Sequence, residues 1–267
     1  MNDRVSLDIK DHVAVVTLER ADKFNAVDIA MIDGLVAAGE TLAADKDVRA
    51  VVLNGRGDHF SAGIDLSVFQ SSDKVLSPAL MAPQGDGDAN YFQRPAMIWR
   101  ELPVPVIAAL HGICYGAGLQ IAFGADMRIA SPDCRLSIME VKWGIIPDMG
   151  MTVTARGVIR PDRLKELAMT GRVLDGNAAL DLGVVTELAA EPLTRAREIA
   201  AAIAGRSPDA VAAIKSLLNQ ALDASQAEAL HLEASLQQRV MGGANQAEAV
   251  RANLDKRAPE FRSRSIG

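Results

Sequence analysis

Two stretches of the chain join an apolar run, a glycine turn and a segment that can form a helix. The first covers residues 59–66 (HFSAGIDL), and the second covers residues 107–126 (IAALHGICYGAGLQIAFGAD). A strand that turns through glycine into a helix directs unpaired backbone N–H groups and the positive helix end at one point. We therefore expect a group that is negative, or becomes negative during a reaction, to bind at these turns. The glycines could also serve the tight turns alone.

Two carboxyl groups stand in apolar surroundings further along the chain. Glu140 lies between Met139 and Val141, and Asp148 lies within residues 145–150 (IIPDMG). Loss of water raises the pKa of a carboxyl group towards the range that suits proton transfer, so both residues are candidate acids or bases. Each also has a structural alternative. Glu140 could be a hydrogen-bonded structural carboxylate, and Asp148 could be the N-cap of a following helix.

The glycines of the second stretch allow a rival interpretation as a dinucleotide-binding motif. That motif has the form G-x-G-x-x-G directly after a strand, and it opens a βαβ unit. The order here is G-x-x-x-G-x-G, and the turn lies deep in the chain. The sequence therefore disfavours a dinucleotide cofactor.

The composition limits the class of protein to which these residues belong. The 267 residues are 49% hydrophobic and 4% aromatic, which predicts a large aliphatic core, and the net charge of −6 argues against a nucleic-acid partner. We see no signal peptide, and no apolar run reaches the roughly 20 residues of a membrane helix, so we expect a cytoplasmic protein. The two cysteines cannot complete a disulfide framework or a zinc site, and we expect no metal.

Hydrophobic periodicity predicts an α/β chain that ends in helices. Strands are predicted over 5–9, 13–18, 49–54, 104–110, 126–130 and 134–138, the first two as a hairpin that turns at Asp11-His12. Helices are predicted over 28–44, with Asp28 as the N-cap, and over 91–101, 119–123 and 160–170. From Pro192 the chain is rich in Ala, Glu, Arg and Gln at helical spacing, which predicts three or four helices. We therefore divide the chain into a core, 1–191, and a C-terminal helical region, 192–267. Residues 67–90 show weak periodicity and are predicted to form a mobile flap.

Several motifs appear in a characteristic order along the chain. They are Thr17-Leu18-Glu19-Arg20 with Asn25-Ala26, FSAGIDL at 60–66, His111-Gly112 with Gly116-Ala117-Gly118, ADMRIA at 125–130, EVKWG at 140–144 and KRAPEF at 256–261. Together they resemble the crotonase (enoyl-CoA hydratase/isomerase) superfamily over essentially the whole chain. The resemblance implies a crotonase-like ββα spiral core with a C-terminal helical oligomerisation region. It also implies a homotrimer or a dimer of trimers.

The resemblance implies an acyl-CoA thioester as substrate, with coenzyme A as part of that substrate and no separate cofactor. Family members stabilise a thioester enolate in an oxyanion hole, and the resemblance assigns its two donors to the backbone N–H groups of Ile64 and Ala117. Loss of one such donor typically costs about 3–4 kcal/mol of transition-state stabilisation. Glu140 falls at the position of a catalytic acid/base in the family.

Gln120 departs from the pattern of the hydratases, which resemble one another in carrying a glutamate there. In those enzymes two carboxylates hold and activate one water. An amide can orient water but cannot exchange a proton at neutral pH, so the two-glutamate mechanism is in doubt. Enoyl-CoA isomerases of the superfamily can move a proton between C2 and C4 with a single glutamate. Asp148 matches an aspartate of dienoyl-CoA isomerases, although these also carry an acid at the position of Gln120.

Further residues are assigned to substrate binding by the same resemblance. Ala26 and Ala62 would lie near the adenine of CoA, while Arg20 and Lys23 are candidates for its phosphates. Lys256 and Phe261 match residues that reach the nucleotide, often from a neighbouring subunit. The flap and the aromatic residues Tyr91, Phe92 and Trp99 are expected to shape the acyl pocket.

The sequence therefore predicts an acyl-CoA enzyme that forms an enolate, with isomerisation modestly favoured. The first alternative is an enoyl-CoA hydratase with an altered acid pair. The second comes from another class of protein: a non-catalytic acyl-CoA-binding protein, which Gln120 would support and Glu140 would not.

Overall fold

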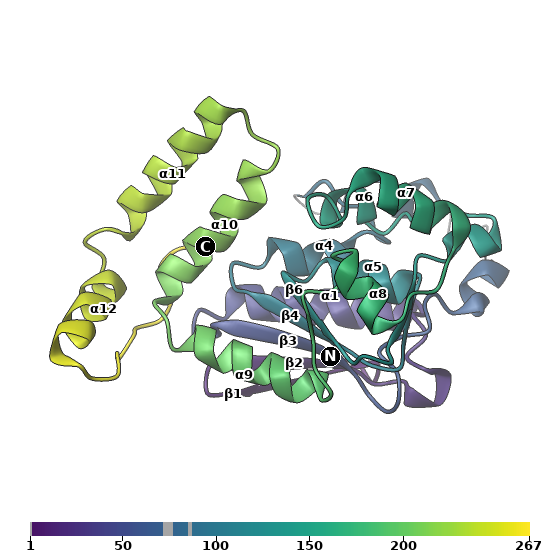
Figure 1. Cartoon of the computed structure of the whole chain (residues 1–267), viewed down its shortest axis with the longest axis horizontal. Helices are drawn as coiled ribbons and strands as arrows, with labels where there is room; N and C mark the ends of the chain where they lie inside the picture. The colour runs from purple at the N-terminus through teal and green to yellow at the C-terminus, as the bar shows by residue number, and fades with distance from the viewer. Residues whose placement is uncertain (1, 72–76, 85–86) are drawn as a thin grey trace.

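The centre of the structure is a twisted six-stranded sheet (Figure 1). The computed structural model describes residues 2–71, 77–84 and 87–267. The sheet has the order β1-β2-β3-β4-β6-β8, in which β1 and β2 are antiparallel and the other neighbours are parallel. Its strands are β1 (Val5–Lys10), β2 (Val13–Leu18), β3 (Ala50–Gly55), β4 (Val106–Leu110), β6 (Met127–Ala130) and β8 (Glu187–Leu188). A second, parallel pair consists of β5 (Ile113–Tyr115) and β7 (Arg135–Ser137).

The first two strands form the hairpin that the sequence predicts. Lys10 pairs with Val13, so the loop has two residues, and both of them, Asp11 and His12, have positive φ angles. Two consecutive residues with positive φ define the type I′ turn, whose twist matches that of a hairpin. The predicted α/β architecture is confirmed.

The two faces of the sheet bury different side chains because successive residues of a strand point to opposite sides. On β3, Val51 and Leu53 join the larger core, whereas Ala50 and Val52 face the other side. Helix α9 (Pro192–Ala204) covers that other side and contacts β3 and β4 (Figure 1). The C-terminal region that we divided off at Pro192 thus begins with a helix that packs on the central sheet.

Seven helices of the described residues pack on the larger core. They are α1 (Ile29–Ala44), α3 (Pro78–Met81), α4 (Arg94–Glu101), α5 (Ala117–Phe123), α6 (Met151–Thr154), α7 (Pro161–Thr170) and α8 (Gly176–Asp181). Short 3₁₀ helices are η1 (Ala21–Lys23), η2 (Leu66–Ser71) and η3 (Glu140–Trp143). Asp28 caps α1 as predicted, since its side chain accepts a hydrogen bond from the Met31 N–H. The predicted flap lies partly outside the described residues.

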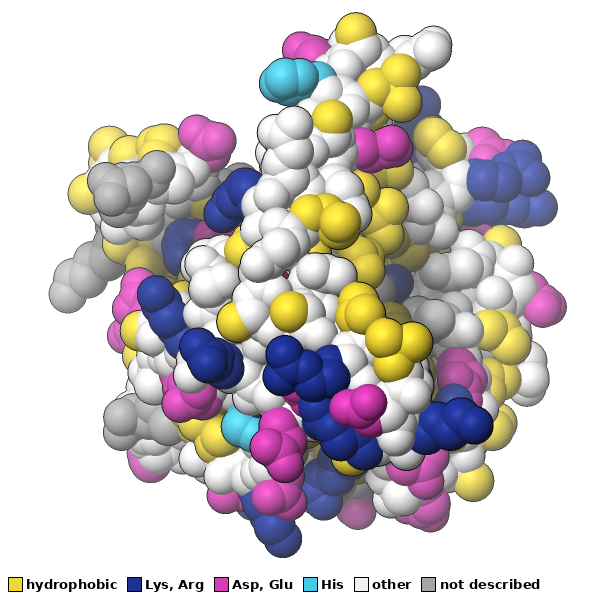
Figure 2. Space-filling model, turned by 90° about the vertical axis from the view of Figure 1, so that its left-hand side faces the viewer, with side chains coloured by type: hydrophobic (Ala, Val, Ile, Leu, Met, Phe, Trp, Pro, Cys, Tyr) yellow, Lys and Arg dark blue, Asp and Glu magenta, His cyan; other side chains and the backbone are white. Residues whose placement is uncertain are grey.

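Three C-terminal helices extend away from the sheet (Figure 1). They are α10 (Pro208–Ala221), α11 (Gln226–Val240) and α12 (Ala244–Asp255). An ion pair between the buried Lys215 and the more exposed Asp126 attaches α10 to the core. Figure 2 shows apolar side chains on the exposed surface of these helices, and the exposed apolar residues include Leu218, Leu222 and Leu254.

Within residues 2–71, 77–84 and 87–267, no helix is long and apolar enough to cross a membrane.

Candidate active site

The two glycine turns of the sequence come together beside the small sheet. The Ser61 N–H donates to the Ile113 carbonyl, and the Tyr115 N–H donates to the Ser61 carbonyl. Gly118 permits this close approach, because a Cβ at this position would lie 2.6 Å from the Cβ of Ser61. The strand β5, which sequence periodicity did not predict, therefore connects the first turn to the second.

The candidate oxyanion donors lie at these turns. Gly63 has a φ of +98°, and a Cβ there would lie 3.7 Å from the Ala117 nitrogen and 2.9 Å from the Tyr115 oxygen. The backbone at Gly63 therefore passes directly beside the start of α5. Neither the Ile64 N–H nor the Ala117 N–H donates to an acceptor in the described part of the chain, and both residues line one cavity. Both amides are therefore available as hydrogen-bond donors at the cavity, as the predicted oxyanion hole needs.

Glu140 opens η3 and is buried, with 6% of its surface exposed. Its Oε1 accepts a hydrogen bond of 2.6 Å from Nε2 of Gln120. Its Oε2 is buried and has no hydrogen-bond partner among the described residues. A buried carboxylate oxygen without a partner is costly, and a catalytic role is one explanation for keeping such a group. A purely structural role for Glu140 would explain the hydrogen bond to Oε1 but not the burial of Oε2 without a partner among the described residues.

The orientation of the Gln120 amide follows from its second hydrogen bond. Its Oε1 accepts from the Met149 N–H at 2.8 Å. A backbone N–H can only donate, so the amide oxygen must face Met149 and the amide nitrogen must face Glu140. Gln120 thus contacts Glu140 directly, and the two side chains leave no room for a water between the bonded atoms.

Burial raises the pKa of Glu140 above its ordinary value, and the nearby charge of Asp148 raises it further. The hydrogen bond from Gln120 lowers this pKa, but burial is the largest effect. A raised pKa brings a carboxyl group closer to the range in which it can both accept and return a proton.

Replacement of Glu140 with glutamine is expected to stabilise the protein increasingly as the pH rises. The folded-state pKa of Glu140 lies above its unfolded value, so ionisation of this group reduces stability as the pH rises through the folded-state pKa. The glutamine variant has no such loss. The melting temperatures of both proteins from pH 4.5 to pH 8 test this. A difference that stays constant or shrinks with rising pH would contradict the assigned environment.

Asp148 lies near Glu140 but does not cap α6. The N-cap of that helix is Gly150, which makes no side-chain capping bond. The helix-cap alternative for Asp148 is therefore wrong. Although the residue as a whole is exposed, desolvation of its carboxyl group raises its pKa. Asp148 lines the same cavity as Glu140 and remains a candidate second acid/base.

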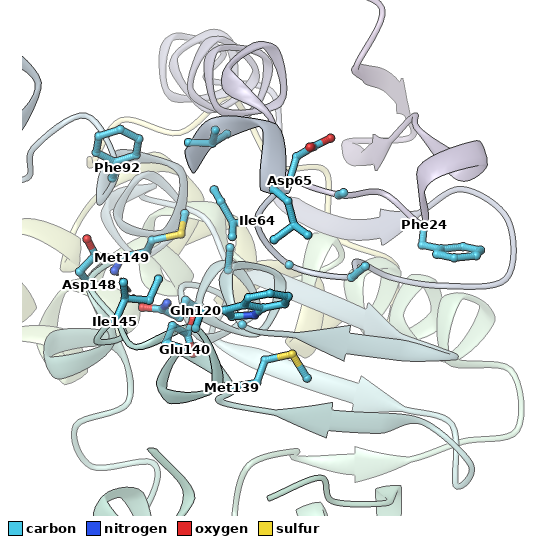
Figure 3. A pocket seen from close by; sticks show the side chains of 18 of the residues that line it. Phe24, Ile64, Asp65, Phe92, Gln120, Met139, Glu140, Ile145, Asp148 and Met149 are labelled. Carbon is cyan, nitrogen blue, oxygen red and sulfur yellow. Dashed lines mark hydrogen bonds between the residues drawn. The ribbon is translucent and has the colours of Figure 1, made fainter. Parts of the chain in front are cut away.

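One cavity of about 890 Å³ contains these groups. Figure 3 shows Phe24 at one end, Phe92 and Asp148 at the other, and Ile64, Gln120 and Glu140 between them. Its walls are mainly apolar and include Leu66, Val68, Met81, Met139, Trp143, Ile145, Ile146 and Met149. An apolar cavity with a few convergent polar groups is typical of a small-molecule site.

Only some of the residues predicted to bind CoA line the cavity. Lys23, Ala26 and Ala62 line the cavity, and Lys23 is the one cation among its described lining residues. Arg20 does not line it. Its guanidinium bonds to Asp65 at 2.6 Å and to the Ala26 carbonyl at 3.0 Å, so it supports the loop that carries the alanine. Hydrogen bonds from Ser67 and Arg20 lower the pKa of Asp65 to about 2.

Lys256 and Phe261 lie away from the cavity of their own chain. Lys256 is the C-cap of α12, which is at the opposite end of the molecule from α6 and α7 (Figure 1). The Phe261 carbonyl accepts from the Arg49 guanidinium, and its ring lies 6.0 Å from the Arg49 Cζ. The structure of one chain therefore does not bring these two residues to the other site residues.

Of the three aromatic residues predicted to shape the acyl pocket, only Phe92 is among the described lining residues of the cavity. Phe92 lines the cavity, but Tyr91 bonds through its hydroxyl to Asp33, and Trp99 is fully buried in the core. Two residues of the site were not predicted. Met149 orients Gln120 through its backbone N–H, and Trp143 forms part of the cavity wall. Nothing in the sequence indicates the Met149 contact, whereas Trp143 lies in the motif that contains Glu140.

Comparison with known proteins places this arrangement in a family. The model of the enoyl-CoA hydratase/isomerase family matches residues 8–264. The chain belongs to this family. It is an acyl-CoA enzyme with the crotonase fold, which confirms the resemblance found in the sequence and sets aside a binding protein without chemistry.

Relatives of the chain carry both hydratase and isomerase names. A Bacillus subtilis protein named "Probable enoyl-CoA hydratase" is 31% identical, over 97% of this chain and 98% of that protein. The mitochondrial Delta(3,5)-Delta(2,4)-dienoyl-CoA isomerase of Mus musculus is 32% identical, over 92% of this chain and 77% of that protein. The crystal structure of an enoyl-CoA hydratase from Mycobacterium tuberculosis H37Rv superposes with a TM-score of 0.85 at 28% identity, covering 98% and 99% of the two chains.

Proposed function

We propose that this enzyme moves the double bond of an enoyl-CoA by a single-base proton transfer, with Glu140 as the acid/base. The observation that carries the proposal is the direct hydrogen bond between Gln120 and Glu140. Gln120 stands where the hydratases carry their second glutamate, and it contacts Glu140 without an intervening gap. Glu140 is then the single proton-exchanging group that acts with the oxyanion donors Ile64 and Ala117 in this cavity, in place of two carboxyl groups that share a water.

The reaction follows from the placement of three groups. The thioester oxygen accepts from the N–H groups of Ile64 and Ala117, and Oε2 of Glu140 removes a proton from C2. The C2–H electron pair forms a dienolate whose charge lies largely on the thioester oxygen. Glu140 then returns the proton to C4, and the double bond moves from C3–C4 to C2–C3. No water is consumed, and the enzyme returns to its starting protonation state.

Asp148 supports a second candidate, dienoyl-CoA isomerisation. Its carboxyl group lines the same cavity and has a raised pKa, and a dienoyl-CoA isomerase is among the relatives. In that reaction the second carboxyl group would exchange a proton at a carbon further along the chain. An Asp148→Asn variant that keeps 3-enoyl-CoA isomerisation and loses dienoyl-CoA isomerisation would separate the two roles.

The proposal is tested by comparing the rates of isomerisation and hydration in one preparation. We expect kcat/KM for a 3-enoyl-CoA to exceed kcat/KM for water addition to crotonyl-CoA. We also expect Gln120→Glu, which restores the second carboxyl group, to shift this ratio towards hydration. Efficient hydration by the natural chain, which the names of many relatives would suggest, would overturn the proposal in favour of a hydratase with an altered acid pair.

The proposed assembly is a homotrimer or a dimer of trimers in which Lys256 and Phe261 reach the CoA of a neighbouring copy. The apolar residues exposed on α10, α11 and α12 support such an assembly, because contiguous apolar surface commonly marks an interface. Sedimentation of the purified chain, whose mass is 28.3 kDa, measures the number of copies directly. A monomer at working concentration would contradict this assignment.

A further inference from the structure

The cavity has an end that single-base proton transfer by Glu140 does not use. We call this the distal end and define it by Phe92, Ile145, Asp148 and Met149, with Ile146, which follows Ile145 in the chain; all five line the cavity. Figure 3 shows four of them on the far side of Glu140 from Phe24. If CoA enters past Lys23 and Phe24 and its carbonyl lies at Ile64, the acyl chain must point towards the distal end.

The walls of the distal end differ in their exposure. Phe92 and Met149 are buried, whereas Ile145 is 39% exposed and Ile146 is 74% exposed. A residue that lines a cavity and is also three-quarters exposed stands where the wall ends. Among the described residues, the apolar wall of the cavity therefore ends at Ile146, whose side chain faces solvent.

We propose that the distal end is an exit for the acyl chain, and that the enzyme accepts long-chain acyl-CoA substrates whose terminal methylenes leave over Ile145 and Ile146. This inference rests on the acyl-CoA function proposed above. The exposed isoleucines provide apolar contact to a chain that continues outwards, whereas a short acyl group would leave them in water. An open end sets no upper limit to chain length, unlike a closed pocket.

The side chains near the exit suit such a substrate. Methionine fills irregular apolar space and adapts to different ligands, and Met149 lies where the chain would turn outwards. Asp148 is the polar group at this end, and the residue as a whole is exposed rather than enclosed by the wall. The specificity-determining residues are therefore Ile145 and Ile146, which make contacts that no short acyl group reaches.

Binding of saturated acyl-CoAs to the whole enzyme tests the inference, because these ligands cannot be isomerised. Calorimetry with C4, C8, C12 and C16 acyl-CoAs, kept below the concentrations at which they form micelles, gives the dissociation constants. We expect affinity to rise by up to about fourfold for each methylene placed inside the cavity and then to level off. An affinity that falls between C8 and C16, as in a closed pocket, would overturn the inference.

A charged residue at the exit provides the second measurement. We expect Ile146→Glu to reduce the ratio of C12 to C4 affinity at least tenfold, and Ile146→Leu to keep it. Ile9→Glu is the matched control, because Ile9 is 43% exposed on β1 and does not line the cavity. Equal ratios in Ile146→Glu and Ile9→Glu would refute the exit. Absence of binding at every chain length would instead refute the acyl-CoA function itself.

Discussion

Glu140→Gln is expected to lower kcat/KM for 3-enoyl-CoA isomerisation by about 10²–10⁴-fold, the range typical for loss of a positioned acid/base. The variant keeps the size of the side chain and can still accept the hydrogen bond from Gln120 Nε2. What it loses is the proton-accepting oxygen, Oε2. The unpartnered state of Oε2 in the folded chain is the structural reason to expect so large an effect.

Glu233→Gln is the matched control for this experiment. Glu233 is exposed on α11 and does not line the cavity, so its replacement is expected to leave the rate unchanged. Steady-state rates and the dissociation constant of a saturated acyl-CoA should be measured for both variants. If Glu140→Gln lost affinity and kept kcat, its role would be binding rather than proton transfer.

Gly63→Ala is expected to lower kcat by about 10²–10³-fold, comparable to the loss of one oxyanion donor. Gly63 has a φ of +98°, which a side chain rarely adopts, and the new Cβ would lie 2.9 Å from the Tyr115 oxygen. Relief of this clash moves the Ile64 N–H away from the Ala117 N–H. The two donors would then no longer converge on one oxygen.

A glycine far from the cavity separates this effect from backbone strain alone. Gly242, between α11 and α12, has a φ of +78°, and a Cβ there would meet nothing within 4 Å. Gly242→Ala therefore carries similar strain without moving the donors, and its kcat should stay near that of the natural chain. Equal losses of kcat in the two variants would show that the Gly63 turn matters for stability and not for the oxyanion.

The order of the elements and the location of the site could be predicted from the sequence. The hairpin depends on residues next to each other in the chain, and so does the Asp28 cap. Gln120, which the resemblance places at an acid position of the hydratases, follows Gly118 closely and lines the cavity. These features are local or follow from motif order, so the sequence shows them directly.

Contacts between distant segments could not be predicted in the same way. The strand β5 has three residues and lies within the glycine turn, where periodicity has too few positions to be recognised. The Met149 N–H that orients Gln120 is 29 residues away along the chain, and a backbone donor leaves no trace in residue types. Trp99 was expected to shape the acyl pocket together with its helix, but its side chain is fully buried in the core, which the residue type does not reveal.

Glu140 alone is proposed to move a substrate proton from C2 to C4 through an enolate, and transfer of an isotope between these carbons tests this. The enzyme is incubated in ordinary water with a 3-enoyl-CoA that carries deuterium at C2, and the label is followed by NMR. We expect deuterium from C2 to appear at C4 of a 2-enoyl-CoA as the main product, and this transfer to be at least a hundredfold slower with Glu140→Gln. Transfer by Glu140→Gln at the rate of the natural chain would contradict the proposal, as would a hydrated main product.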